Sequence, residues 1–139
     1  MDSAKLKQTI IAAEGVRLKP YTDTTGNLTI GVGHRLANGI SEAIADRLLN
    51  DDLVEAQRDL EAAWPTLGTL NDVRQRAFIE LAFNLGVHGL MLFSKMLHAA
   101  AIGDWKNAAL ELVNSAANAQ EPSRFHRLSL MLETGEDVS

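Results

Sequence analysis

The chain has 139 residues, of which 46% are hydrophobic and 22% charged, and it contains no cysteine. This length and composition are those of one ordinary globular domain, and the absence of thiols excludes disulfides and zinc–thiolate sites. The net charge of −5 offers no basic footprint for nucleic acid, and the longest apolar run is too short to cross a bilayer. We therefore expect a protein that neither binds nucleic acid nor inserts into a membrane, and we expect it to be a monomer.

The first expected element is a helix from about Ser3 to Ala13, with Ser3 as its N-cap and Gly15 as its stop signal. Its apolar side chains recur at helical spacing: Leu6, Ile10, Ile11 and Ala13. Glu14 falls at the C-terminal end, where the helix dipole disfavours a charged carboxylate and so suits a general acid. For a lone glutamate in this position, an exposed surface residue is the commoner interpretation.

A compact β-hairpin is expected next, over roughly residues 17–36. Gly26 and Asn27 favour a turn, and the segment that follows, residues 28–33, alternates small and β-branched residues that suit a strand. A helix end and a hairpin arranged in this way bring the carboxylates of Glu14 and Asp23 and the hydroxyl of Thr29 into one small space.

The remainder of the chain is expected to be helical. Ser41 predicts the start of a long, heavily charged helix that continues to about Ala63. Later helical segments are predicted over Asp72–Leu85, Gly89–Ile102, Trp105–Val113 and Pro122 to about Glu133. The predicted class is α+β and mostly helical, with a small mixed lobe (about 1–40), a connecting helix (about 41–63) and an all-helical lobe (about 65–139).

Two carboxylates that face each other across a cleft are the minimal apparatus of glycoside hydrolysis. One protonates the departing glycosidic oxygen, and the other acts on water or on the sugar carbon. Placement favours Glu14 as the acid and Asp23, in a threonine-rich loop, as the ionised partner, with Thr29 available to hold a water beside it. Such a pair alone is weak evidence, because most Glu and Asp side chains are surface charges.

The full string EGVRLKPYTDTTGNLTIGVGH, residues 14–34, resembles the signature of the phage-type lysozymes, or muramidases. Glu14, Asp23 and Thr29 meet the family's spacing of Glu, eight residues, Asp, five residues and Thr without a gap. The resemblance continues through VRQRAFIELAFNLGVHGLMLFSKML, GDWKNAALELVNS and QEPSRFHRLSLMLETG, so that it covers nearly the whole chain. It implies a single lysozyme-like domain over residues 1–139.

This resemblance also implies an activity, the hydrolysis with inversion of the β-1,4 bond between N-acetylmuramic acid and N-acetylglucosamine in peptidoglycan, which causes bacterial lysis. Glu14 would be the general acid, Asp23 would position or activate the water, and Thr29 would support that water. We expect no cofactor and no metal ion, because the histidines lack carboxylate or cysteine neighbours at metal-ligand spacing.

Further positions acquire roles only through the resemblance. His34 matches a histidine that pairs with an aspartate on the long helix, here Asp52, in a structural role. Arg124 matches an arginine that reaches the catalytic glutamate, and Arg35 and Phe83 fall at substrate-binding positions of the cleft. Without the resemblance, His34 would be interpreted as a surface histidine, Arg124 as a solvated helix charge and Phe83 as a core residue.

The chain departs from the family pattern mainly at residues 115–119, SAANA, where an aromatic residue is usual at the position of Ala117. Its loss would leave a cavity or loosen sugar binding. Asn84 stands in place of a longer amide, and the acidic balance is unusual for a wall-degrading enzyme. A weakly active or inactive wall-binding or structural module therefore remains an alternative, whereas a lytic transglycosylase is disfavoured by Asp23 and Thr29.

The location of the protein is a further expectation. No signal peptide is recognisable in MDSAKLKQTIIAAEG. For an enzyme of phage origin, we therefore expect accumulation in the cytoplasm of the host bacterium. Access to the cell wall would then depend on a membrane pore made by another protein.

Overall fold

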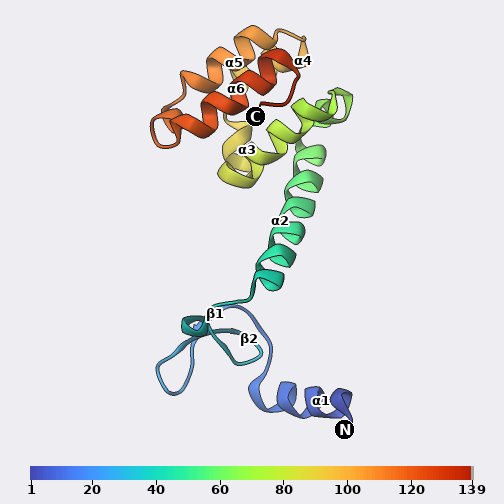
Figure 1. Cartoon of the computed structure of the whole chain (residues 1–139), viewed down its shortest axis with the longest axis vertical. Helices are drawn as coiled ribbons and strands as arrows, with labels where there is room; N and C mark the ends of the chain where they lie inside the picture. The colour runs from blue at the N-terminus through green and yellow to red at the C-terminus, as the bar shows by residue number, and fades with distance from the viewer. Residues whose placement is uncertain (139) are drawn as a thin grey trace. The chain divides into compact units, whose positions relative to one another are not determined.

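A computed structural model of the chain describes residues 1–138, and the predicted α+β, mostly helical class is confirmed (Figure 1). The structure divides into two compact units, Met1–Arg47 and Leu48–Ser139. The boundary between them falls within the long helix α2 (Glu42–Ala63). This helix begins where it was predicted to begin, because the Ser41 hydroxyl accepts a hydrogen bond from the Ile44 N–H at 3.2 Å.

The first unit opens with helix α1 (Ser3–Glu14). The predicted N-cap was wrong by one residue: the Asp2 carboxylate, not Ser3, accepts a hydrogen bond from the Lys5 N–H at 3.1 Å. Asp2 leaves Ser3 free to adopt helical geometry and places a negative charge at the positive end of the helix dipole. The helix ends as expected at Gly15, whose φ of 74° is favourable for glycine and whose N–H donates to the Ile11 carbonyl.

The sheet of the first unit is antiparallel, in the order β1 (Arg17–Thr22), β2 (Leu28–Gly31), β3 (His34–Arg35). The predicted hairpin corresponds to β1 and β2, and β3 extends it to a third strand, followed by the 3-10 turn η1 (Leu36–Asn38). Thr29 lies opposite Tyr21 on one side and opposite Arg35 on the other. Thr29 therefore lies on the central strand of the sheet, between β1 and β3.

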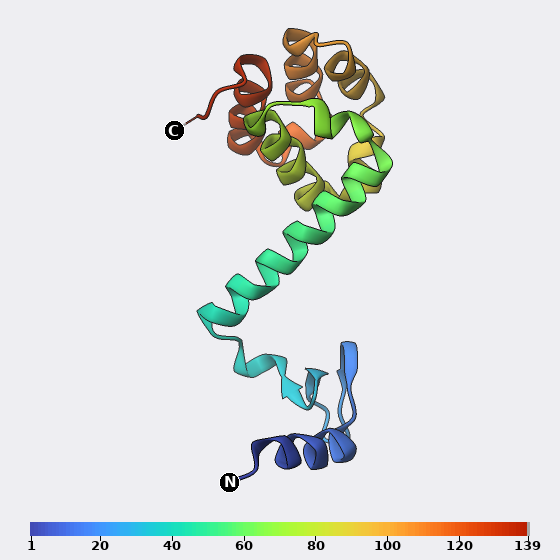
Figure 2. The ribbon, with the colours of Figure 1, turned by 90° about the vertical axis from the view of Figure 1, so that its right-hand side faces the viewer.

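The second unit is helical, and its helices α3 to α6 pack around one another (Figure 2). In addition to the C-terminal part of α2, it contains η2 (Pro65–Thr69), α3 (Asp72–Met91), α4 (Ser94–Ala101), α5 (Trp105–Val113), η3 (Ala116–Ala119) and α6 (Pro122–Thr134). Helix α3 is broken at Gly86 (φ 75°, ψ 153°), which is the predicted stop, but helical geometry resumes directly after it. Helix α5 has the predicted bounds and the predicted cap, since the Asp104 side chain accepts from the Asn107 N–H.

The hydrophobic core lies in the second unit. It includes the rings of Trp64 and Phe78, whose centroids are 4.7 Å apart, and the fully buried side chains of Leu60 and Phe125. Within residues 1–47, in contrast, only Thr29 is buried, with 1% of its surface exposed. The burial of this polar side chain requires a hydrogen bond, which is described below.

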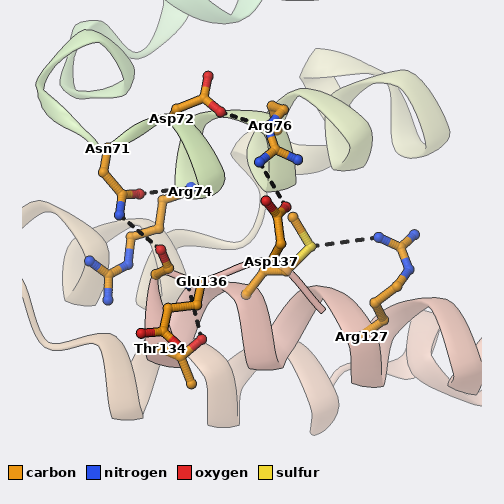
Figure 3. Close-up of polar contacts among 10 residues, drawn as sticks. Asn71, Asp72, Arg74, Arg76, Arg127, Thr134, Glu136 and Asp137 are labelled. Atoms are coloured by element: carbon orange, nitrogen blue, oxygen red, sulfur yellow. Dashed lines mark hydrogen bonds and ion pairs between the residues drawn. The ribbon is translucent and has the colours of Figure 1, made fainter. Parts of the chain in front are cut away.

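A polar clamp joins the start of α3 to the end of α6 (Figure 3). The Arg74 guanidinium donates to the carbonyl oxygens of Leu132, at 2.8 Å, and Glu133, at 3.1 Å. The Asn71 amide donates to the Gly135 carbonyl at 3.1 Å, and Gly135 ends α6 in the left-handed conformation. The clamp thus satisfies carbonyl groups that the end of a helix would otherwise leave to water.

Over residues 1–138, no single helix is both long and apolar enough to cross a membrane; α3 and α4 meet this test only together, as a pair bent by 103°. No group of three or more His, Cys, Asp or Glu side chains in the same part of the chain is placed to hold a metal ion.

Candidate active site

Glu14 is the last residue of α1, and its side chain lies against the turn between β2 and β3. A Cβ atom placed on Gly33 in this turn would be 3.1 Å from Oε2 of Glu14 and 3.2 Å from Cδ. The carboxyl group thus rests over the glycine backbone, while the residue as a whole stays exposed. The end of the first helix and the sheet meet at this point.

Asp23 lies in the loop between β1 and β2, and one of its carboxylate oxygens collects three hydrogen bonds. Oδ1 accepts from the Thr25 N–H at 2.9 Å, the Thr25 hydroxyl at 2.8 Å and the Asn27 N–H at 2.8 Å. The Asn27 N–H and then the Thr25 hydroxyl are the largest causes that lower the pKa of Asp23, and the charge of Arg35 adds to them. Asp23 is therefore ionised at neutral pH, and Oδ2 carries none of these hydrogen bonds.

Thr29 satisfies its buried hydroxyl by donating to the Asn27 carbonyl oxygen at 2.8 Å. The same carbonyl accepts from the Asp23 N–H at 2.9 Å. The hydroxyl proton of Thr29 is thus committed to the backbone, and toward any further partner its oxygen acts as an acceptor.

Asn27 holds both of these residues, and sequence reasoning assigned it only a turn. Its N–H and carbonyl bind Asp23, its carbonyl binds Thr29, and its side-chain amide donates to the Thr25 hydroxyl at 2.7 Å. An available signal was the spacing of Asp23, Thr25 and Asn27, since Asp commonly binds backbone N–H groups a few residues further along a turn. Gly33 was likewise noted only as part of a strand.

His34 and Arg35 form the short strand β3 at the edge of the sheet. Nε2 of His34 lies 2.8 Å from the Gly39 carbonyl oxygen. Since a carbonyl only accepts, Nε2 carries the hydrogen and the ring is fixed by its own unit. Arg35 is exposed, pairs in register with Thr29 and acts electrostatically on Asp23. The predicted pairing of His34 with Asp52, a residue of the second unit, stays a prediction.

Phe83 is not a plain core residue, because 43% of its surface is exposed on α3. It borders two hollows of the second unit, one of about 230 Å³ that Asp52 also lines and one of about 480 Å³ that Arg124 also lines. Its predicted contact with substrate stays a prediction.

Arg124 is surrounded by carboxylates of its own unit. Its Nε lies 3.4 Å from Oε2 of Glu80, and its Nη1 lies 3.3 Å from Oε1 of Glu121. Glu121 in turn accepts from the Asn84 amide at 2.9 Å, and the other amide atom of Asn84, Oδ1, is buried without a hydrogen-bond partner among the described residues. The predicted approach of Arg124 to Glu14 concerns both units and stays a prediction.

The alanine-rich segment borders an open hollow. About 450 Å³ of space lies beside Ala116 and Ala117, and it is also lined by α4 and the loop before it, including Phe93 and Met96, and by the C-terminal end of α5, including Glu111. Ala117 is partly buried against the core. The small side chains thus leave space at the place where the family pattern calls for an aromatic ring.

Comparisons with known proteins extend over nearly the whole chain. Residues 11–124 match the model of a family described as phage lysozyme. Two proteins of Dictyostelium discoideum, named probable T4-type lysozymes 1 and 2, are each 29% identical, and each alignment covers 95% of this chain and 95% of the relative. The pre-baseplate central spike protein Gp5 of Enterobacteria phage T4 is 30% identical over 88% of this chain, which corresponds to 26% of the spike protein.

Proposed function

The chain belongs to the phage lysozyme family, whose members are peptidoglycan-degrading glycoside hydrolases, and we propose that it cleaves the β-1,4 bond between N-acetylmuramic acid and N-acetylglucosamine. The observation that carries this proposal is that the two carboxylates of the first unit have different surroundings. One carboxylate is exposed at a helix end, and a second is kept ionised beside a hydroxyl that can only accept. These are the parts of an acid and of a water-binding site.

Glu14 acts as the general acid in this proposal. Its exposed side chain can deliver a proton to the glycosidic oxygen as the bond to the anomeric carbon breaks. The sugar that departs leaves with that proton, and the other sugar becomes electron-deficient at the anomeric carbon.

Asp23 and Thr29 orient the attacking water. Asp23 offers Oδ2, which accepts none of the hydrogen bonds that hold Oδ1, and Thr29 offers lone pairs on a hydroxyl that donates its proton to the Asn27 carbonyl. A water that donates one hydrogen to each of these acceptors presents its lone pair to the sugar. As the carbon–oxygen bond forms, Asp23 accepts the proton that water loses, and attack from the face opposite the leaving group inverts the anomeric carbon.

The substitution Glu14→Gln tests the assignment of the acid, because it removes the transferable proton and preserves size. We expect the rate of clearing of outer-membrane-permeabilised Gram-negative cells to fall by about 10²- to 10⁴-fold, the usual contribution of a general acid. Glu133→Gln, the same change on an exposed residue of α6, is the matched control and should clear the cells at the wild-type rate. Equal clearing by wild type and Glu14→Gln, with both proteins folded, refutes the mechanism.

A second candidate is a wall-binding or structural module without vigorous hydrolysis. The open hollow beside Ala117 favours it, and so does the similarity to a protein named as a central spike of a phage baseplate. Sedimentation of the wild-type protein with purified peptidoglycan, without release of reducing sugar, would support this candidate. Release of reducing ends that depends on Glu14 would exclude it.

A further inference from the structure

We propose that Gly33 is a positioning residue for the general acid, since its lack of a side chain provides the space in which the carboxyl group of Glu14 rests. The inference depends on the proposed function for its catalytic meaning. The contact itself lies wholly within residues 1–47 and stands on geometry alone.

The contact involves the whole end of the Glu14 side chain. A Cβ on Gly33 would lie 3.1 Å from Oε2, 3.2 Å from Cδ and 3.3 Å from Cγ of Glu14. Carbon atoms that touch without strain are about 3.5–4.0 Å apart. Any residue with a side chain at position 33 therefore moves the acid by a few tenths of an ångström.

The turn that supports Glu14 also belongs to the strands that hold Thr29. Gly33 stands between β2 and β3, whose register pairs Ile30 with His34 and Thr29 with Arg35. The same strand pair thus places the acid beside its turn and carries the Thr29 hydroxyl on its strand β2. Because the three atoms nearest the Cβ position of Gly33 belong to Glu14, an added side chain there changes the position of the acid relative to Thr29.

A comparison with Gly31 separates this contact from backbone conformation. Gly31 has φ +69° and Gly33 has φ +66°, so both require the left-handed region and both are strained by a side chain. No atom outside its immediate neighbourhood lies within 4 Å of the Cβ position of Gly31, whereas the three nearest atoms at the Cβ position of Gly33 all belong to Glu14. Gly31→Ala is therefore a matched control for Gly33→Ala.

The first experiment compares the kinetics of these two variants on soluble peptidoglycan fragments. Misplacement of a reacting group by less than 1 Å has large effects on rate, and we expect Gly33→Ala to lower kcat by about 10-fold with KM changed by less than about 2-fold. Gly31→Ala should keep kcat within about 2-fold of the wild type. Equal kcat losses in the two variants, or an unchanged kcat in Gly33→Ala, would overturn the proposal.

A second pair of variants reduces the backbone strain. Asparagine occupies the left-handed region more readily than alanine, so Gly33→Asn and Gly31→Asn keep the added Cβ at a smaller conformational penalty. The same contrast in kcat is expected from this pair if either alanine variant fails to fold, and equal values in the asparagine pair would overturn the proposal.

A stability cycle tests the contact without using activity. In the Glu14→Ala background the atoms that meet the Cβ are absent, so Gly33→Ala and Gly31→Ala should lower the melting temperature equally. With Glu14 present, Gly33→Ala should lower it further than Gly31→Ala does. The same difference in both backgrounds would show that Gly33 does not support Glu14. A wild type without hydrolytic activity would refute the proposed function, while this cycle would still decide whether Gly33 positions Glu14.

Discussion

At the scale of single residues, Asp23 is held by donors that all reach the same carboxylate oxygen. The backbone of Asn27 and both donors of Thr25 bind Oδ1, which stabilises the charged form and leaves Oδ2 open. Because two of the three donors are backbone N–H groups, the loop fixes the direction of the carboxylate as well as its charge. Both properties suit the role proposed for Asp23, which is to orient a water.

The Thr25 hydroxyl provides a direct test, because Thr25→Val removes this donor and keeps the shape of the side chain. We expect the pKa of Asp23 to rise toward its ordinary value of 3.8. A carboxyl NMR titration would measure it. Thr24→Val is the matched control, since the Thr24 hydroxyl makes none of the hydrogen bonds to Asp23, and an equal rise in both variants would contradict the assignment.

The direction of the pH effect on stability follows from this lowered pKa. Since the folded-state pKa of Asp23 lies below the unfolded value, its charged form stabilises the fold above about pH 4, and the contribution is lost as the pH falls through the folded-state pKa. Thr25→Val should therefore lower the free energy of unfolding at pH 7 more than at pH 2. If Thr25→Val lowered the free energy of unfolding by the same amount at pH 7 and at pH 2, the hydrogen bond from Thr25 would not depend on the charge of Asp23.

Sequence reasoning proposed catalytic side chains, which stay predictions, and did not point to the residues that hold them through the backbone. Glu14, Asp23 and Thr29 stand out because carboxylates and hydroxyls have recognisable chemistry at a recognisable spacing. Asn27 acts largely through its N–H and carbonyl, and Gly33 through the absence of a side chain. In the sequence, Asn27 and Gly33 look like ordinary turn residues. Their roles become visible only in the folded backbone.

At the scale of helices, the clamp between α3 and α6 makes Arg74 a stability determinant. Arg74→Met removes two hydrogen bonds to the last carbonyls of α6 and the packing of the guanidinium 4.1 Å from the centre of the Trp105 ring. The hydrogen bond to Leu132 is partly buried and the one to Glu133 is exposed. A hydrogen bond to a charged group contributes about 1.5–3 kcal/mol, and an exposed one contributes much less, so we expect the free energy of unfolding to fall by about 2 kcal/mol. Chemical denaturation would measure the loss.

Arg76 is the internal control, two positions away on the same helix. It pairs with Asp72 at 2.8 Å and with Asp137 at 2.7 Å (Figure 3). However, 47% of its side chain is exposed. Exposed ion pairs contribute about 0–1 kcal/mol, and Arg76→Met should therefore cost less than Arg74→Met. A larger loss for Arg76→Met would show that the ion pairs, rather than the capped carbonyls, hold the end of α6.

Most of the helices could be predicted because their ends carry chemical signals. Asp104, Ser41, Pro122 and Gly86 each mark a boundary by a cap, a fixed φ or a left-handed conformation. The signal was ambiguous at the N-terminus, where Asp2 and Ser3 are both good caps. The strand β3 has two residues and no turn dipeptide of its own, so its pairing with β2 depends on contacts that no local pattern specifies.

At the scale of the whole molecule, the charges are unevenly distributed along the chain. The proposed catalytic side chains lie in residues 1–47, which contain six basic and five acidic residues. Residues 48–139 contain seven basic and thirteen acidic residues. The first unit is thus nearly neutral and the second accounts for the negative net charge. Toward a polyanionic cell wall, the protein as a whole is repelled rather than attracted.

This repulsion predicts that hydrolysis of isolated peptidoglycan becomes faster as salt is added. The screening length falls from about 30 Å at 0.01 M to about 10 Å at 0.1 M ionic strength, so the long-range repulsion weakens over this range. The triple variant Asp51→Lys, Glu133→Lys, Glu136→Lys reverses three exposed acidic residues of the second unit and brings the net charge close to zero. Its rate should be higher than that of the wild type at low salt and less dependent on salt. A wild-type rate that falls from 0.01 M to about 0.1 M salt would mean that local attraction at the substrate site outweighs the net charge.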